Sequence, residues 1–295
     1  MSGRFAPTPS AGLHLGNLRT ALVAWLFARS SGREFKLRIE DLDQARTKRA
    51  VEIAQTQILD LARLGLDFDG EVMWQSSRTA IYQTYADQLA DRLYECFCTR
   101  AEIAQSAAAP HGDGFRPYPG TCRELTAQQC QELAKTRTPA LRIRADGVSF
   151  QVHDHWAGDY SARVDDFVVR RNDGVWAYNF AVVIDDIAQG VDQVVRGADL
   201  LSSAPRQGWL TSLLGGIVPE YAHIGLVTAS DGERLAKRDR ARTLFELATE
   251  GIPPSRVLAL LGRSLQLCEA DETVTATQLL SRFNPEKLSA RSWSW

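Results

Sequence analysis

The chain has no uninterrupted apolar run of about eighteen residues, so a membrane-spanning helix is not expected. Its opening, Met-Ser-Gly-Arg, lacks the apolar core of a secretory signal. Net charge is small, with 34 basic and 36 acidic residues, so composition does not indicate a general nucleic-acid binder. Cysteine is scarce, with five residues in 295. These absences predict a cytoplasmic protein without a disulfide framework, and nothing in the sequence indicates self-association, so a monomer is expected.

The apolar fraction of 44% is sufficient for a packed core. The segment 3–6 is typical of a short buried strand, and 35–39 of a second one. Between them, 14–30 carries leucines and Trp25 at helical spacing, and Gly32 follows as a helix terminator. This strand–helix–strand order predicts a doubly wound α/β fold, with a ligand at the carboxyl ends of the strands.

The rest of the chain alternates in the same way. Helices are expected at 47–64, 77–94, 204–214, 243–249, 254–261 and 276–283, and strands at 167–170, 182–184 and 224–227. The strands at 167–170 and 182–184 are expected to return to the main sheet.

A change of composition interrupts this pattern, because 105–120 is rich in Ala, Pro and Gly and lies between cysteines. We therefore expect four parts. They are the first half of the doubly wound α/β domain at 1–94, an inserted subdomain at 95–165, the second half of the α/β domain at 166–242, and a short helical region at 243–295.

The first motif runs from Arg4 to Ser10 and continues as His14-Leu15-Gly16-Asn17. Its prolines stiffen a turn that leads into a helix, and free backbone N–H groups at the start of that helix favour phosphate. His14 can donate a hydrogen bond to phosphate oxygens, and Gly16 allows a nucleotide to approach closely. The alternative is structural: His14 caps the helix and Gly16 packs against the sheet.

Cysteine spacing indicates a metal site. Cys96 and Cys98 form a Cys-x-Cys pair and Cys122 follows a Gly/Pro-rich stretch, which makes three ligands of a tetrahedral zinc site. His111 is a generic candidate for the fourth ligand. The alternative is three buried or unliganded thiols.

Two further patterns carry charge. The run Arg38-Ile39-Glu40-Asp41-Leu42-Asp43 places carboxylates at the end of a strand, where they can bind an ammonium group or cap a helix. Glu233 to Arg238 is a basic run before a helix, which is often a solvated face. Arginines that are candidates for RNA phosphate contacts are Arg142, Arg144, Arg170 and Arg171.

Taken together, these motifs resemble class I aminoacyl-tRNA synthetases of the glutamyl/glutaminyl branch. The run 4–18 is similar to the opening of glutamyl-tRNA synthetases, with a HIGH-type signature at 14–17. The strings at 166–171, 178–186 and 195–201 resemble this branch strongly, and 234–238 is similar to the KMSKS loop. Departures are Ala11 and Asn17 in the first signature, and Arg234 and Ala236 in the second.

The resemblance implies a Rossmann-like class I synthetase catalytic domain, divided between 1–94 and 166–242, with a zinc-binding subdomain inserted at 95–165. It also implies roles for named residues. His14 and Lys237 would act in catalysis. Glutamate would be bound by Arg4, Ala6, Ser10, Glu40, Tyr178 and Arg196, with Glu40 on the α-amino group and Arg4 on the side-chain carboxylate. ATP, with Mg²⁺, would be bound by His14, Gly16, Asn17, Leu235 and Lys237. One structural Zn²⁺ would be held by Cys96, Cys98, Cys122 and, in place of His111, Tyr118.

The implied reaction forms glutamyl-adenylate and pyrophosphate from L-glutamate and ATP. Only about fifty residues follow Arg242, which is too few for the large anticodon-binding region of glutamyl-tRNA synthetases. Together with the tyrosine-containing zinc pattern, this shortness resembles a truncated member of the branch, and that resemblance implies queuosine at the wobble position of tRNA(Asp) as the acceptor, with the anticodon stem-loop in the catalytic pocket. Two alternatives stay open: a minimal glutamyl-tRNA synthetase that charges the 3′ end, and an inactive regulator that binds RNA or glutamate.

Overall fold

The computed structural model describes residues 1–43, 47, 49–99, 101–103, 117–228, 242–269, 271–289 and 291–294. It begins with β1 (Ser2–Phe5), α1 (Leu15–Ser30) and β2 (Glu34–Ile39), and β1 pairs with β2 in parallel. Gly32 has a φ of +69°, which favours glycine and turns the chain from α1 into β2. The predicted strand–helix–strand unit is thus confirmed.

A seven-stranded sheet runs through the molecule in the order β3-β2-β1-β9-β10-β6-β7. All neighbouring strands pair in parallel except β6 and β7, which form an antiparallel pair. From β1 the chain goes to β2 on one side, while β9 lies on the other, so the strand order reverses between β1 and β9. The further strands are β3 (Met73–Trp74), β6 (Ser149–Asp154), β7 (Gly158–Arg163), β9 (Val191–Gly197) and β10 (Glu220–Ile224).

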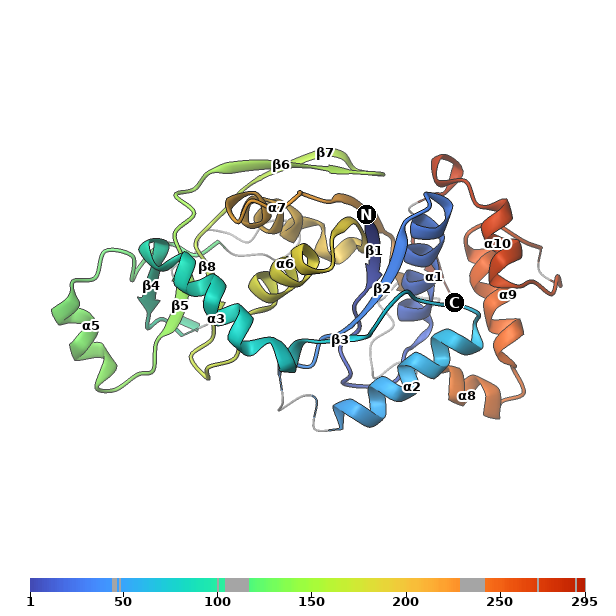
Figure 1. The fold of residues 1–295 in the computed structure, drawn as a ribbon, viewed down its shortest axis with the longest axis horizontal. Coiled ribbons are helices and arrows are strands. Elements are labelled where there is room, and N and C mark those ends of the chain that lie inside the picture. Colours follow the sequence, from blue (N-terminus) through green and yellow to red (C-terminus); the bar gives the residue numbers. More distant parts are fainter. Residues whose placement is uncertain are drawn as a thin grey trace.

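Helices cover both faces of this sheet (Figure 1). On one face α1 packs with α9 (Pro254–Ser264) and α10 (Ala276–Arg282) around Leu18, Leu22 and Leu26, which are fully buried. On the other face α6 (Tyr178–Ala188) and α7 (Ala204–Leu213) pack against each other. The C-terminal helices therefore complete the core over α1.

A second, three-stranded sheet lies away from the first (Figure 1). It consists of the antiparallel strands β4 (Leu93–Cys96), β5 (Ala140–Ile143) and β8 (Phe167–Arg170), with α5 (Ala127–Ala134) beyond them. Two predictions are wrong here. The strand at 167–170 exists but pairs with β5, so it does not return to the main sheet. Residues 182–184 lie inside α6, where their side chains are buried against neighbouring helices.

Some predicted boundaries also change. The helix expected at 77–94 ends at Gln88, after which the chain becomes strand β4. The strand expected at 224–227 falls between two strands, because β10 ends at Ile224 and β11 begins at Val227. Strands β6 and β7 belong to the main sheet although they lie in the range 95–165; the domain boundaries themselves stay a prediction. The other elements are α2 (Ala50–Arg63), η1 (Gln75–Arg78), α3 (Thr79–Gln88), η2 (Ala90–Arg92), η3 (Ala198–Ser203), β11 (Val227–Thr228), α8 (Leu244–Thr249), η4 (Pro285–Lys287) and β12 (Trp293–Ser294).

Candidate active site and cysteine cluster

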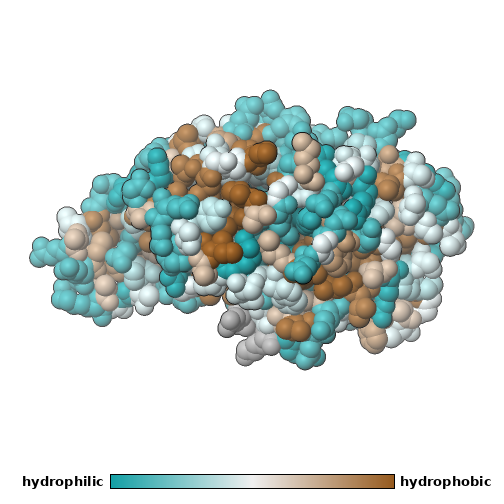
Figure 2. All heavy atoms as spheres, viewed as in Figure 1, coloured by the Kyte–Doolittle hydropathy of each residue, from teal (hydrophilic) through white to brown (hydrophobic). Residues whose placement is uncertain are grey.

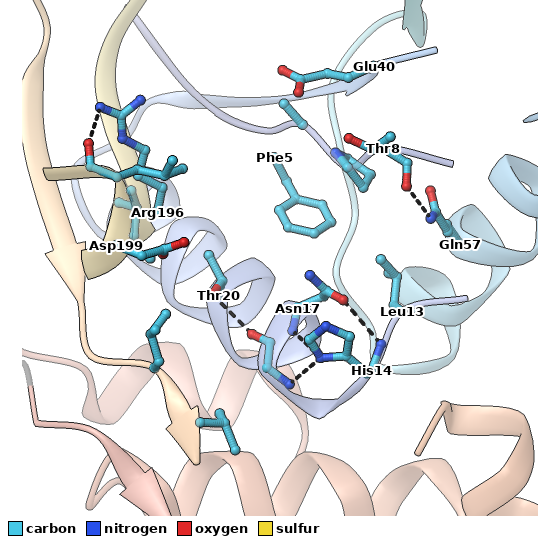
Figure 3. Close-up of a pocket in the computed structure, with 18 of the residues that line it drawn as sticks. Phe5, Thr8, Leu13, His14, Asn17, Thr20, Glu40, Gln57, Arg196 and Asp199 are labelled. Carbon is cyan, nitrogen blue, oxygen red and sulfur yellow. Dashed lines mark hydrogen bonds between the residues drawn. The ribbon is translucent and has the colours of Figure 1, made fainter. Parts of the chain in front are cut away.

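A cavity of about 580 Å³ opens at the carboxyl ends of β1, β2 and β9, where the strand order reverses. This is the position at which open α/β sheets bind their ligands. Figure 3 shows Glu40 on one side of the cavity, Arg196 on another, and His14 with Asn17 at its base. The sequence-predicted residues that line it are Arg4, Ala6, Ser10, His14, Gly16, Asn17, Glu40, Tyr178 and Arg196.

His14 is the N-cap of α1. Its Nδ1 accepts hydrogen bonds from the backbone N–H groups of Gly16, at 3.1 Å, and Asn17, at 3.4 Å, and the Asn17 side chain accepts from the His14 N–H. The expectation of free N–H groups at this end is therefore wrong for Gly16 and Asn17, because the cap takes them. Since Nδ1 is an acceptor, the neutral imidazole carries its proton on Nε2. Capping and a donor role for His14 are thus compatible.

Described residues before and after the stretch 229–241 lie next to this cavity. Val227 lines it, and Thr243 pairs with His14 in an isolated antiparallel bridge. Lys237 and Leu235, which the sequence analysis assigns to ATP, lie outside the described residues.

Charged side chains on β2 and the neighbouring β1 are buried. Arg38 is fully buried, and its guanidinium lies 2.7 Å from the carboxylate of Asp186 and 3.6 Å from that of Glu40. Arg4 also reaches Asp186, at 3.3 Å. Burial raises the pKa of Glu40 to about 7, although the positive charges of Arg38 and Arg4 act in the opposite direction.

Arg196 is held differently, with only 5% of the residue exposed. Its Nε donates to His223 Nε2 at 2.9 Å, one terminal nitrogen donates to Gln207 Oε1 at 2.6 Å, and the other to the carbonyl of Leu200 at 3.2 Å. In the described part of the chain no carboxylate lies within ion-pair distance of this guanidinium. Arg196 is thus a buried residue and not part of an exposed surface ion pair.

Several lining residues were not predicted. Gln57 donates to the carbonyls of Thr8 and Ala11 and so fixes the turn after β1. Gln57 lies on α2, far in sequence from the first motif, and nothing in the pattern of that helix indicates a contact with the cavity. Asp199 and the backbone around Gly197 also line the cavity. The string at 195–201 resembles the family, but within it the resemblance implies a binding role only for Arg196.

The cysteine cluster lies at β4 and the following loop. The Sγ atoms of Cys96, Cys98 and Cys122 all lie within 4.8 Å of one another, and those of Cys98 and Cys122 are 3.5 Å apart. Tyr118 Oη is 3.4 Å from Cys96 Sγ and 3.8 Å from Cys98 Sγ. Zinc–sulfur bonds of ~2.3 Å place tetrahedral sulfurs about 3.8 Å apart, so the three thiols could hold a metal. His111 lies outside the described residues.

The four arginines that are candidates for RNA phosphate contacts differ in burial and in their partners. Arg142 is buried, donates to the carbonyl of Asp166 at 2.9 Å, and lies over the Tyr118 ring at 3.8 Å, so it is not a surface phosphate contact. Arg144 pairs with Glu124, and Arg171 with Asp43. Arg170 is exposed and stacks at 5.3 Å over Trp176. Of the four, Arg170 keeps the most accessible charge.

This combination of sheet, cavity and signatures has counterparts among known proteins. The family described as tRNA synthetases class I (E and Q), catalytic domain, matches residues 1–295, and the chain belongs to it. Membership implies the use of ATP.

Within that class, the chain is similar to glutamyl-Q tRNA(Asp) synthetases. That of Nocardia farcinica is 52% identical over 295 residues, covering 99% of this chain and 92% of its own length. That of Cutibacterium acnes is 55% identical over 269 residues, covering 91% and 77%. Among solved structures, a glutamate tRNA ligase from Elizabethkingia meningosepticum, in complex with its amino acid, is 26% identical with a TM-score of 0.80. The match covers 99% of this chain and 66% of that one.

Proposed function

We propose that this chain activates L-glutamate with ATP and transfers the glutamyl group to queuosine at the wobble position of tRNA(Asp). In the first step a glutamate α-carboxylate oxygen attacks the α-phosphorus of ATP, and the bond to the bridging oxygen breaks to release pyrophosphate. In the second step a hydroxyl of queuosine attacks the activated carbonyl carbon, AMP leaves, and the hydroxyl proton is released. No protein nucleophile is needed, so catalysis rests on positioning and charge.

The observation that carries the proposal is that Arg196 has no carboxylate partner among the described residues. A buried guanidinium normally has an acidic partner, because the burial of a lone charge is costly. Here its described partners are neutral acceptors, and it faces the same cavity as Glu40. A ligand with an anionic and a cationic group, such as glutamate, would pair with both. Arg4, Ala6, Ser10 and Tyr178 line the same cavity and would complete the glutamate site.

We assign ATP to the end of the cavity next to α1. The imidazole of His14, with its proton on Nε2, would donate to phosphate, while Gly16 leaves room for the nucleotide. A Cβ on Gly16 would lie 3.0 Å from the His14 ring, so a larger residue there would disturb the cap itself. Asn17, Leu235 and Lys237 complete the proposed ATP site, and Lys237 would balance charge on the departing pyrophosphate with Mg²⁺.

The choice of acceptor rests on the relatives. The relatives from Nocardia farcinica and Cutibacterium acnes, at 52% and 55% identity over most of the chain, are named glutamyl-Q tRNA(Asp) synthetases. The glutamate tRNA ligase shares the fold at half that identity. Transfer to a base in an anticodon loop agrees with the way RNA loops present unstacked nucleotides to proteins.

We further propose that the cysteine cluster holds one structural Zn²⁺, with Tyr118 as the fourth ligand. The phenol oxygen lies 3.4 and 3.8 Å from two of the sulfurs, which are separations suited to neighbouring corners of one tetrahedron. When bound, zinc would fix the loop 117–122 to β4.

The activation step is tested by ATP–pyrophosphate exchange with the purified chain, Mg-ATP and either glutamate, glutamine or aspartate. We expect exchange with glutamate and little with the other two. The variant R196Q, which removes the cation, is expected to raise the glutamate KM by about tenfold or more, since hydrogen bonds to charged groups contribute roughly 1.5–3 kcal/mol. Absence of glutamate-dependent exchange under conditions in which tRNA is also supplied would contradict the proposal and favour an inactive regulator.

A further inference from the structure

Behind Arg196 lies a line of buried polar side chains that runs from β9 across β10 to β6. His223, on β10, accepts from Arg196 through Nε2 and contacts Asp154, at the end of β6, through Nδ1 at 2.6 Å. The side chains of His223 and Asp154 are each 1% exposed. Gln207, on α7, accepts from Arg196 and in turn donates to Asn179 Oδ1 at 2.9 Å. The side chains of His223 and Gln207 therefore contact the guanidinium directly, and Asp154 and Asn179 hold those two side chains.

The positions of the protons in this line follow from chemistry. Arg196 has only donors, so His223 Nε2 must be unprotonated. The Nδ1 proton then points to Asp154, which also accepts from the backbone N–H groups of His223, Trp156 and Ala157. Burial lowers the pKa of His223, and Asp154 opposes that effect. His223 is thus a neutral imidazole with one tautomer.

This arrangement fixes the orientation of the Arg196 guanidinium without neutralising its charge. Three of the five N–H groups of Arg196 are occupied by a histidine, an amide oxygen and a carbonyl. The nearest negative charge in the line, Asp154, is one side chain further away. The guanidinium is therefore fixed in rotation while its charge stays available to an anion in the cavity.

We propose that His223, oriented by Asp154, is a positioning residue that holds Arg196 for the glutamate carboxylate, and that Gln207 keeps the neighbouring position neutral. This inference rests on the proposed function, because the anion it serves is the amino-acid substrate. It concerns how the site selects a carboxylate: a carboxylate in place of His223 or Gln207 would satisfy Arg196 internally and reduce its affinity for an anionic ligand.

The first test compares H223N with H223Q by ATP–pyrophosphate exchange. Gln places an amide oxygen near the position of Nε2 and can still accept from Arg196, whereas Asn reaches only the position of Nδ1. We expect H223N to raise the glutamate KM on the order of tenfold, with little change in the ATP KM, and H223Q to restore a substantial part of that loss. The control is H153N, because His153 is exposed on the same strand as Asp154 and bonds only Asp159 among the described residues. It should match the wild type.

The second test is Q207E, which is nearly isosteric and adds one negative charge beside Arg196. We expect it to fold, to raise the glutamate KM by about tenfold or more, and to narrow the preference for glutamate over glutamine. Equal glutamate KM values for the wild type, H223N and Q207E would overturn the inference while wild-type exchange still supports the proposed function. If H223N fails to fold, Q207E decides the outcome. A wild type without glutamate-dependent exchange would contradict both.

Discussion

At the scale of single residues, the site depends on how buried charges are paired. Arg4 and Arg38 share Asp186, so much of their charge is neutralised within the protein. Arg196 has neutral partners, and Glu40 faces the cavity with one arginine 3.6 Å away. The cavity therefore offers an anion receptor in Arg196 and a titratable acid in Glu40. Arg4 on the substrate carboxylate stays a prediction, and the neutral described partners of Arg196 make Arg196 a second candidate for that carboxylate.

The raised pKa of Glu40 predicts a pH dependence of glutamate binding. Burial raises that pKa to about 7, so the side chain is increasingly protonated as the pH falls below 7. A neutral Glu40 cannot form an ion pair with the substrate ammonium group. Because the bound ammonium favours the ionised form of Glu40, substrate binding releases the proton of that carboxyl group. We expect the glutamate KM to rise as the pH falls from 8 to 6, by up to about tenfold per unit below the pKa. Free glutamate keeps the same charge over this range.

The matched variant is E40Q, whose glutamate KM should be high and nearly constant over the same range. The ATP KM of the wild type serves as the internal control and should change little. A wild-type glutamate KM that stays flat from pH 8 to 6 would show that Glu40 does not hold the ammonium group.

The position of the first motif at the cavity could be predicted from the sequence, because a strand, a proline-containing turn and a helix start in this order place it at the carboxyl end of the sheet. The partners of Arg196 could not. His223, Gln207 and Asp154 come from three elements far apart in sequence, and each is an ordinary polar residue in its own segment. Only the packing of β6, β9, β10 and α7 brings them together.

At the scale of elements, helices with strong periodicity were predicted well and short apolar runs were not. The run Val182-Val183-Ile184 is typical of a strand, yet it lies in α6, because burial against α7 and the sheet outweighs the preference of β-branched residues. The strand at 167–170 was found, but its partner β5 was not, since pairing is a long-range property. Sequence pattern indicates that a strand exists, not which sheet it joins.

The loop that follows β4 is the element most dependent on the proposed metal. We expect the purified chain to contain about one zinc per molecule and C98S to contain much less, with a lower melting temperature. C130S is the matched control, because Cys130 packs against the same cluster from α5 but is not one of the three grouped thiols. Elemental analysis and thermal unfolding measure both effects.

The fourth ligand is decided by Y118F and H111A. Y118F keeps the ring beneath Arg142 and removes only the oxygen, so a fall in zinc affinity would identify Tyr118 as the ligand. Unchanged affinity in Y118F together with a loss in H111A would assign the position to His111 instead.

At the scale of the whole molecule, the two helical layers and the C-terminal region form one framework around the cavity. Arg19 on α1 is 2% exposed and joins three segments, donating to the carbonyls of Gly225 and Arg291 and to Ser264 Oγ. β12 pairs with β11, directly before the segment 229–241. The region after Arg242 therefore supports the site from behind.

The hydropathy of the surface does not indicate which RNA the protein binds. Figure 2 shows hydrophilic residues over much of the face in view, with apolar residues gathered over α3 and α6 and again near α2. Val51 and Leu59 on α2 and Phe245 on α8 are exposed. No helix among the described residues is long and apolar enough to cross a bilayer. The α/β class and the position of the site could be predicted from strand order and motifs, but no residue pattern encodes the nucleotide that receives glutamate.

The central claim is the identity of that nucleotide. The direct measurement incubates the purified chain with zinc, Mg-ATP, radiolabelled glutamate and either tRNA(Asp), with or without queuosine, or tRNA(Glu), and then maps the labelled nucleotide after nuclease digestion. The account predicts label at the wobble nucleotide of queuosine-containing tRNA(Asp) and none in tRNA(Asp) that lacks queuosine. Label on the 3′ adenosine of tRNA(Glu) would contradict it and would identify a minimal glutamyl-tRNA synthetase.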